Sequence, residues 1–129
     1  MKKIISDYLD ICILYKDDKD FIGYYLDNEI RFRIAGNTSP AIKLKDWLTV
    51  PTDASKPRAF LYAKEYAQNF MKSRGVEPVA SNVTTALDDA FLLDVSEYYY
   101  RTASEAIRRH DPNHLVLGTR LHGRHLTLP

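Results

Sequence analysis

The sequence is short of several residue types and patterns, and each absence narrows the class of protein. Cys12 is the only cysteine in 129 residues, so no disulfide can form within the chain, and its apolar surroundings predict a small core residue. Basic residues exceed acidic ones by a single charge, which gives no support for nucleic-acid binding. No apolar run approaches the roughly 20 residues that a membrane-spanning helix needs. These absences favour an ordinary globular domain without a nucleic-acid or membrane partner.

The chain also has no clear signature of a cofactor, a metal site or an export signal. It contains neither a glycine-rich phosphate loop nor a Gly-x-Ser-x-Gly nucleophile elbow. His114, His122 and His125 lie close in sequence, but no cysteine or carboxylate has metal-ligand spacing with them. We therefore expect no metal and no cofactor. Ser6 and nearby aspartates interrupt the apolar stretch that a signal peptide would require, and the localisation is left open.

What the sequence does contain is a short apolar run that ends abruptly in polar residues. Phe21 to Leu26 predicts a strand, and Asp27, Asn28 and Glu29 follow it. A strand buried on both faces, as in parallel sheets, is a near-continuous apolar run. In a (β/α)8 barrel the functional side chains lie where the strands end. An Asn-Glu pair at such a place suggests an acid/base catalyst beside a substrate-binding group; the alternative is a solvated loop residue.

The apolar spacing along the chain predicts helices that alternate with strands. Helices are expected over residues 3–15, 40–48, 57–74 and 86–110, and strands over residues 21–26 and 114–121. Gly75 is expected to end the third of these helices. The apolar stripe of the fourth includes Tyr98 and Tyr99, and Asp88 suits its positive N-terminal end. The helix–turn–strand order is the repeat of a parallel α/β fold.

A second motif, at the end of the last predicted helix, carries a family resemblance. It reads AIRRHDPNHL over residues 106–115 and continues as LVLGTR over residues 115–120. Together with IGYYLDNE over residues 22–29, it resembles the region of the acid/base strand in retaining glycoside hydrolases with a TIM barrel, of the β-agarase-like and β-galactosidase-like kind. The resemblance covers most of the chain and is poor from about residue 37 to residue 82.

The resemblance implies an α/β fold, namely a partial (β/α)8 TIM barrel from about the third helix to the fifth strand. Residues 1–129 would form one partial glycoside hydrolase barrel domain, with a helical excursion over the cleft at residues 37–82, after the acid/base strand. A complete barrel typically needs roughly 250 residues. The chain is therefore interpreted as a fragment of a glycosidase, and its own status as an enzyme is uncertain.

The same resemblance assigns roles at the catalytic strand. Glu29 would be the general acid/base, and Asn28 would hydrogen-bond the 2-hydroxyl of a β-linked galactose-type poly- or oligosaccharide. Retaining hydrolysis uses a second carboxylate as nucleophile, which is expected at the end of a strand beyond Pro129. The chain alone is therefore predicted to be inactive.

Three further residues are candidates for binding the carbohydrate. Arg120 and His122 end the second predicted strand and would line a sugar subsite if they share the barrel face of Glu29; the alternative is that they are solvated. Trp47 would stack on a sugar ring, or else anchor a core or rim.

An alternative function from another class is also consistent with the length. The chain could be a small autonomous α/β domain that binds a partner or forms a homo-oligomer without catalysis. Its predicted strands would leave unpaired edges, which favour self-association.

Overall fold

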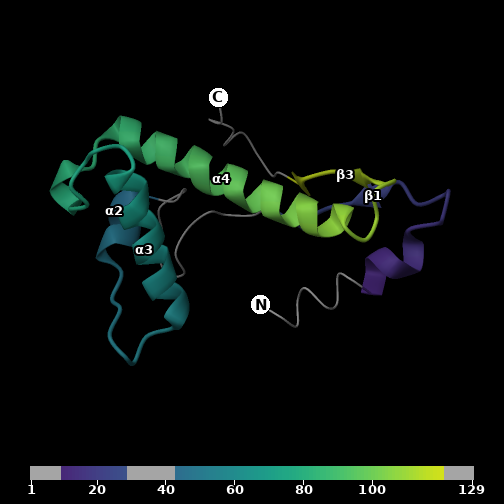
Figure 1. Cartoon of the computed structure of the whole chain (residues 1–129), viewed down its shortest axis with the longest axis horizontal. Helices are drawn as coiled ribbons and strands as arrows, with labels where there is room; N and C mark the ends of the chain where they lie inside the picture. The colour runs from purple at the N-terminus through teal and green to yellow at the C-terminus, as the bar shows by residue number, and fades with distance from the viewer. Residues whose placement is uncertain (1–9, 29–42, 121–129) are drawn as a thin grey trace. The chain divides into compact units, whose positions relative to one another are not determined.

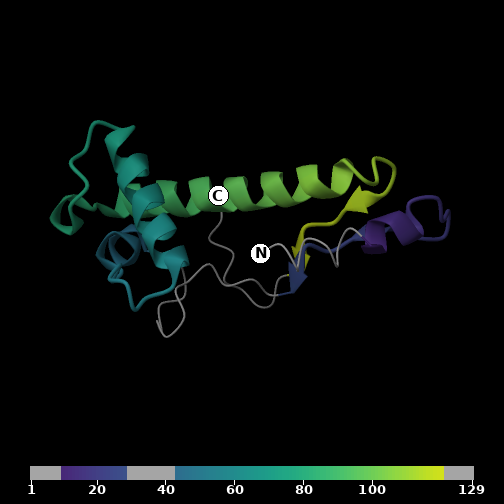
Figure 2. The ribbon, with the colours of Figure 1, turned by 60° about the horizontal axis from the view of Figure 1, so that its bottom comes forward.

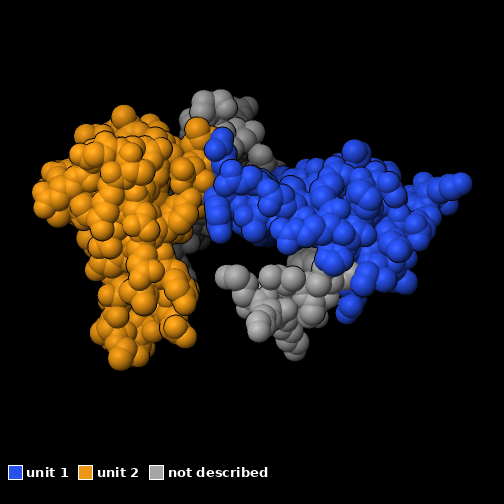
Figure 3. Space-filling model, in the orientation of Figure 1, with its two compact units in different colours: residues 1–30, 97–129 blue, residues 31–96 orange. Residues whose placement is uncertain are grey.

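The computed structural model describes residues 10–28 and 43–120 of the chain. The chain divides into two compact units, which Figure 3 colours separately. Unit 1 consists of residues 1–30 and 97–129, and unit 2 consists of residues 31–96. Unit 2 is thus one uninterrupted segment, whereas unit 1 combines both ends of the sequence. The single domain over residues 1–129 and the excursion over residues 37–82 stay predictions.

Unit 2 is built from helices. Its elements are α2 (Leu44–Thr49), α3 (Arg58–Lys72), the short 3-10 helix η1 (Ala80–Asn82) and the part of α4 (Thr85–Arg108) up to Ser96. Figure 1 shows α2 beside α3. The predicted helices at 57–74 and 86–110 are confirmed to within about two residues at each end. The predicted start of the helix at 40–48 lies outside the described residues.

The core of unit 2 forms around the fully buried ring of Phe91 on α4. Its centroid lies 5.0 Å from that of Phe70 on α3 and 5.3 Å from that of Trp47 on α2, both edge to face. The other buried members of this core are Leu44, Leu48, Ala67 and Met71. Ala67, Phe70 and Met71 share the buried face of α3, because residues three and four apart lie on one face of a helix.

Residues close in sequence fix where α3 ends and where α4 begins. Gly75 has a φ of +70°, and Val76 N donates to Met71 O at 3.1 Å, so a left-handed glycine ends α3 as predicted. At the other end, Leu87 N donates to Thr84 Oγ1 at 3.3 Å. Thr84 therefore caps the N-terminus of α4 by satisfying an amide that has no partner inside the helix.

Replacing Thr84 with alanine is expected to destabilise unit 2 by about 1 kcal/mol, the usual cost of losing a capping hydroxyl. The measurement is urea unfolding followed by the fluorescence of Trp47, the single tryptophan, which packs against Phe91 of α4. The matched control is Thr84→Ser, which keeps the hydroxyl and should retain most of the stability. Equal losses in the two variants would show that the hydroxyl is not the cause.

Asp88 has a second role beyond the favourable position expected for it at the start of α4. Its Oδ1 accepts a hydrogen bond from Leu44 N at 2.8 Å, and its Oδ2 lies 3.5 Å from Lys43 Nζ. The first amides of a helix have no partner within the helix. Asp88 therefore supplies one for α2 and ties α2 to the start of α4 within unit 2.

Unit 1 contains two parallel strand pairs. β1 (Gly23–Tyr24) pairs with β3 (Leu115–Val116), and β2 (Asp27–Asn28) pairs with β4 (Thr119–Arg120). Partners are separated by the same number of residues in all four pairs, so the register does not slip between the two pairs. Figure 1 labels β1 next to β3, and in Figure 2 the dark blue segment again runs along the yellow one. The strand predicted over 21–26 contains β1, and residues 27–28, which were expected to follow that strand, form β2. The strand predicted over 114–121 is divided into β3 and β4, which pair in parallel with β1 and β2 as predicted for such a fold.

Hydrogen bonds continue through the interruption between the two pairs. Leu117 N donates to Tyr24 O at 2.8 Å, and Leu26 N donates to Gly118 O at 2.7 Å. Gly118 has a φ of +74°, which is outside the extended region and favours glycine. The strand predicted at 114–121 is therefore divided because its backbone turns locally at this glycine while the pairing is kept.

Gly23 is required by the close approach of β1 to β3. A Cβ at this position would lie 2.9 Å from the carbonyl carbon of Leu115 and nearer still to its oxygen. Backbone atoms held in a strand pair cannot move aside as a flexible side chain would. The glycine in the IGYY run thus allows the two strands to pair.

Gly23→Ala is expected to destabilise unit 1 by about 2 kcal/mol, a typical cost of overpacking. Hydrogen exchange of peptides from residues 10–28 and 109–120 would report the loss, because this pairing protects their amides. The control is Ile22→Ala, since that side chain is 72% exposed and its removal should change stability by less than about 0.5 kcal/mol. Unchanged exchange in Gly23→Ala would contradict the required close approach.

The core of unit 1 lies on one side of the strand pair. Cys12, Tyr24, Leu26 and Ile107 are buried together, which confirms the core role of Cys12. The expectation of a strand buried on both faces is wrong for the described residues, because Ile22, Tyr25, Leu115 and Leu117 are exposed. These apolar side chains are therefore left largely open to solvent in the described part of the chain.

The structure differs from the prediction at Tyr98 of α4 and in the first predicted helix. Tyr98 was placed on the buried stripe of α4, but it is 53% exposed, because the buried face changes along this long helix. Residues 10–15 of the helix predicted over 3–15 are helical; the rest lies outside the described residues, and Ile13 is exposed rather than buried. No helix in the described ranges is long and apolar enough to span a bilayer.

Candidate active site

The predicted catalytic strand runs through β1 and β2, and β2 ends at Asn28 next to β4. Asp27 pairs with Thr119, and Asn28 pairs with Arg120. Because the two strands are parallel, their carboxyl ends lie at the same edge. The structure therefore brings together Asn28 and Arg120, two of the residues expected to bind substrate. Both are exposed.

Two of the predicted site residues lie outside the described residues. Glu29, the expected acid/base, follows Asn28 directly in the sequence, and His122 comes two residues after Arg120. The catalytic role of Glu29 and the subsite role of His122 therefore stay predictions.

The Asp27 carboxylate already has partners in unit 1. Its Oδ1 accepts a hydrogen bond from Asn28 N at 2.7 Å, and its Oδ2 accepts one from the Tyr99 hydroxyl of α4 at 3.3 Å. These bonds fit a role in fixing the end of β2 against α4. Sequence reasoning did not identify Tyr99 as a neighbour of the motif, because the two are 72 positions apart.

Trp47 belongs to unit 2 and is part of its apolar core. Its ring is edge-on to Phe91 and lies 6.3 Å from Tyr66, centroid to centroid. Its indole Nε1 is buried and has no hydrogen-bond partner in the described structure. This placement matches the core alternative of the sequence analysis, and the sugar-stacking role stays a prediction.

A buried polar cluster lies at the opposite ends of the strands, where β3 begins. The fully buried Asp111 accepts from the Tyr24 hydroxyl at 2.7 Å and contacts His114 Nδ1 at 2.6 Å through the same Oδ2. Its Oδ1 accepts from Asn113 N at 3.0 Å and His114 N at 3.2 Å. Asp111 directly follows the helix predicted over 86–110 and is the centre of this cluster.

The hydrogen bonds of the cluster set the charges of its members. Burial acts to raise the pKa of Asp111, but the donors from Tyr24, His114 and Asn113 outweigh it and lower that pKa to about 2. Burial and the bond to Asp111 raise the pKa of the Tyr24 phenol far above its usual range. The nearby Cys12 thiol has a pKa raised by burial. Asp111 is thus ionised, and Tyr24 and Cys12 are neutral, at ordinary pH.

No group of three or more histidine, cysteine, aspartate or glutamate side chains within residues 10–28 and 43–120 is arranged to hold a metal ion.

Comparison with known proteins connects this arrangement to one enzyme class. The chain is similar in structure to part of a GH50 glycoside hydrolase. The match is to the crystal structure of BpGH50, with a TM-score of 0.67 and 29% sequence identity. It covers 94% of this chain and 25% of that one, so the chain spans about a quarter of the length of the solved structure. No family model matches the sequence, and no curated protein matches it either.

The comparison supports the expected family only at a coarse level. The fold is a small α/β arrangement with parallel strand pairs that matches part of a GH50 structure, and the relation to that enzyme is fragment-like. The similarity extends over both units, since it covers nearly the whole chain. A glycoside hydrolase relation is therefore established by structure, over a quarter of one known enzyme.

Proposed function

We propose that this chain is a segment of a retaining glycoside hydrolase that cleaves β-linked galactose-type poly- or oligosaccharides. Its strands would belong to a (β/α)8 barrel, from about the third helix to the fifth strand. The observation that carries the proposal is the parallel pairing of β2 with β4, which aligns Asn28 with Arg120 at the carboxyl edge directly before Glu29. The similarity to BpGH50 supports the enzyme class.

The proposed chemistry assigns one of two catalytic carboxylates to this chain. Glu29 would protonate the leaving oxygen and then act as the base toward water, while a second carboxylate roughly 5 Å away attacks the anomeric carbon. Asn28 would hydrogen-bond the sugar 2-hydroxyl, with Arg120 and His122 in a neighbouring subsite. Asp27 is a poor candidate for the second carboxylate, because its oxygens already accept bonds from Asn28 N and Tyr99.

The first experiment is to read the coding DNA beyond Met1 and Pro129. The proposal expects further barrel strands in frame, including a downstream strand that ends in a glutamate. The product of that frame should hydrolyse agarose-derived oligosaccharides or an aryl β-galactoside and retain the anomeric configuration, which proton NMR can follow. Stop codons close to both ends would overturn the proposal of an active enzyme and leave a remnant.

A second candidate function is supported by the exposed apolar side chains of unit 1. Ile22, Tyr25, Leu115 and Leu117 are between 40% and 72% exposed, and large exposed apolar patches mark association sites. An autonomous domain that covers these side chains by forming a homo-oligomer would account for them. Size-exclusion chromatography and thermal melting of the 129-residue chain separate the two candidates. A discrete oligomer with a cooperative transition favours this one, and aggregation or a molten state favours the enzyme segment.

A further inference from the structure

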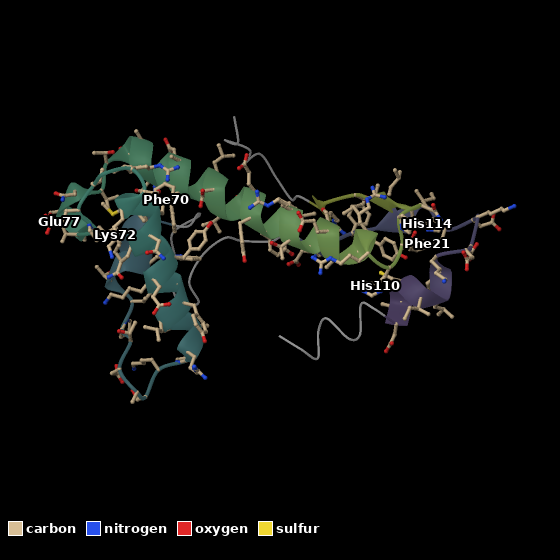
Figure 4. All side chains as sticks on the ribbon, in the orientation of Figure 1. Phe21, Phe70, Lys72, Glu77, His110 and His114 are labelled. Atoms are coloured by element: carbon tan, nitrogen blue, oxygen red, sulfur yellow. The ribbon has the colours of Figure 1, made fainter. Side chains whose placement is uncertain are left out.

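The ring of His114 bridges two loops of unit 1 that lie far apart in the sequence. Its Nδ1 is 2.6 Å from Asp111 Oδ2, in the loop before β3. Its Nε2 is 2.8 Å from the carbonyl oxygen of Asp18, in the turn before β1. The side chain is 11% exposed, and its ring packs edge-on to Phe21 with centroids 5.2 Å apart. Figure 4 shows His114 and Phe21 together.

The chemistry of the two partners selects one protonation state of the ring. A backbone carbonyl oxygen can only accept a hydrogen bond. Asp111 already receives three other donors, from Tyr24 and the backbone of residues 113 and 114, so it is an ionised acceptor. A neutral imidazole has one N–H, whereas an imidazolium has two. Both contacts are therefore hydrogen bonds only when His114 carries a proton on each nitrogen.

The other titratable and charged groups around the ring are consistent with this state. Two acidic residues, Asp111 and Asp18, lie next to the ring. The Oδ1 atom of Asp18 accepts a hydrogen bond from Asp20 N at 2.9 Å. Arg108 of α4 donates through Nη1 to the carbonyl of His114 at 2.9 Å and so faces the backbone rather than the ring. Tyr24 on β1 donates to Asp111, and Cys12 on the preceding helix lies beside Tyr24; both groups are neutral.

We propose that His114 is an imidazolium clasp that joins the turn before β1 to the loop before β3, and that loss of one proton to solvent opens it. After deprotonation one ring nitrogen has no hydrogen, so its lone pair faces the lone pair of the oxygen beside it and the two repel each other. The bond to the Asp18 carbonyl is the one released, because Asp111 is a charged acceptor and holds the remaining N–H more strongly. Alkaline pH would then free the turn at residues 16–20 from His114. The proposal concerns unit 1 alone and does not depend on the enzymatic function.

The direction of the pH effect follows from the contacts. The bonds to the Asp18 carbonyl and the Asp111 carboxylate raise the pKa of His114. A raised folded-state pKa contributes stability that is fully present below the unfolded value, about 6.5 for histidine, and is lost as pH rises through the folded value. Asp111 affects stability at acid pH. Its lowered pKa contributes stability that is fully present above the ordinary carboxyl pKa and is lost as pH falls toward 2.

The direct test is nitrogen-15 NMR of the histidine rings in the unaltered folded protein, titrated from about pH 5 to about pH 9 around the ordinary histidine value. Two protonated ring nitrogens are expected on His114 to a higher pH than the ordinary histidine pKa. The Asp20 amide and the other amides of residues 16–20 should shift with the same midpoint. A His114 ring that titrates at or below the ordinary value overturns the proposal, whether the ring is solvated or the contact does not persist.

A variant pair supplies the second readout. His114→Gln should lower the melting temperature at about pH 5.5 and remove much of the loss that the unaltered chain shows between pH 5.5 and about pH 8.5, the range around the histidine pKa. His110→Gln is the matched control, because His110 is exposed and lies beyond α4 in the same loop; it should keep the wild-type pH slope. A His114→Gln protein with an unchanged slope contradicts the clasp.

Discussion

Glu29→Gln in the complete enzyme is expected to reduce hydrolysis of substrates with poor leaving groups by about 100- to 10,000-fold, the usual contribution of a general acid or base. Glutamine keeps the size and polarity of the side chain but cannot supply the proton that the departing sugar oxygen needs. The measurement is kcat/KM for a galactose-type oligosaccharide. It should be paired with kcat/KM for an aryl β-galactoside whose leaving group needs little protonation and which should therefore retain more activity in the first step.

The dependence on the leaving group makes this result specific. A damaged fold would reduce both activities equally, whereas loss of the acid reduces the oligosaccharide activity more. Glu105→Gln is the matched control, since that side chain is exposed and lies 4.0 Å from Arg109 in a surface pair, which contributes little. Near wild-type turnover of the oligosaccharide by Glu29→Gln would remove Glu29 from the catalytic pair.

Asp111→Asn is expected to destabilise unit 1 by about 3 kcal/mol, the low end of the cost of breaking a buried charged pair. The carboxylate is fully buried and accepts from Tyr24, His114 and two backbone amides. An amide in its place has one acceptor oxygen, and its NH2 group would face donors on one side. The loss should reach both strands of the β1–β3 pair, because Tyr24 lies in β1 and His114 immediately precedes β3.

Hydrogen exchange can localise this effect without a global unfolding curve. Peptides from residues 10–28 and 109–120 should exchange faster in Asp111→Asn, and peptides from α2 and α3 should not change, because unit 2 has its own core. The control is Asp20→Asn, an equal charge change at an exposed position of the same unit. Equal protection in wild type and Asp111→Asn would contradict a structural role for the carboxylate.

The helices were predictable because their signals are local. Gly75 and Thr84 end and begin helices through contacts within a few residues, and the stripe that contains Ala67 and Phe70 needs no information about the rest of the chain. Tyr98 was misplaced because periodicity identifies a stripe but not where along a helix the buried face changes. The division of the strand predicted over 114–121 was also missed, since it depends on the conformation of Gly118, which the apolar pattern does not reveal.

Part of the candidate site was predictable and part was not. The placement of Asn28 beside Arg120 follows from two strands that run in parallel and end at one edge. The cluster around Asp111 was missed because its members come from a turn, a strand and a loop. Tyr24 lies 87 residues from Asp111, and Asp18 lies 96 residues from His114. Only folding brings such partners together, and no spacing in the sequence marks them.

This separation has a consequence for the order of events during synthesis. β1 cannot pair until β3 has been made, and their neighbours Tyr24 and Asp111 are 87 residues apart. At translation rates of about 5–20 residues per second, β1 waits on the order of 4–20 s for its partner. Unit 2 emerges in that interval, and its described residues, which lie within 43–96, have a core of their own. We therefore expect it to fold first, so that the growing chain leaves the ribosome with an ordered middle before its two ends can meet.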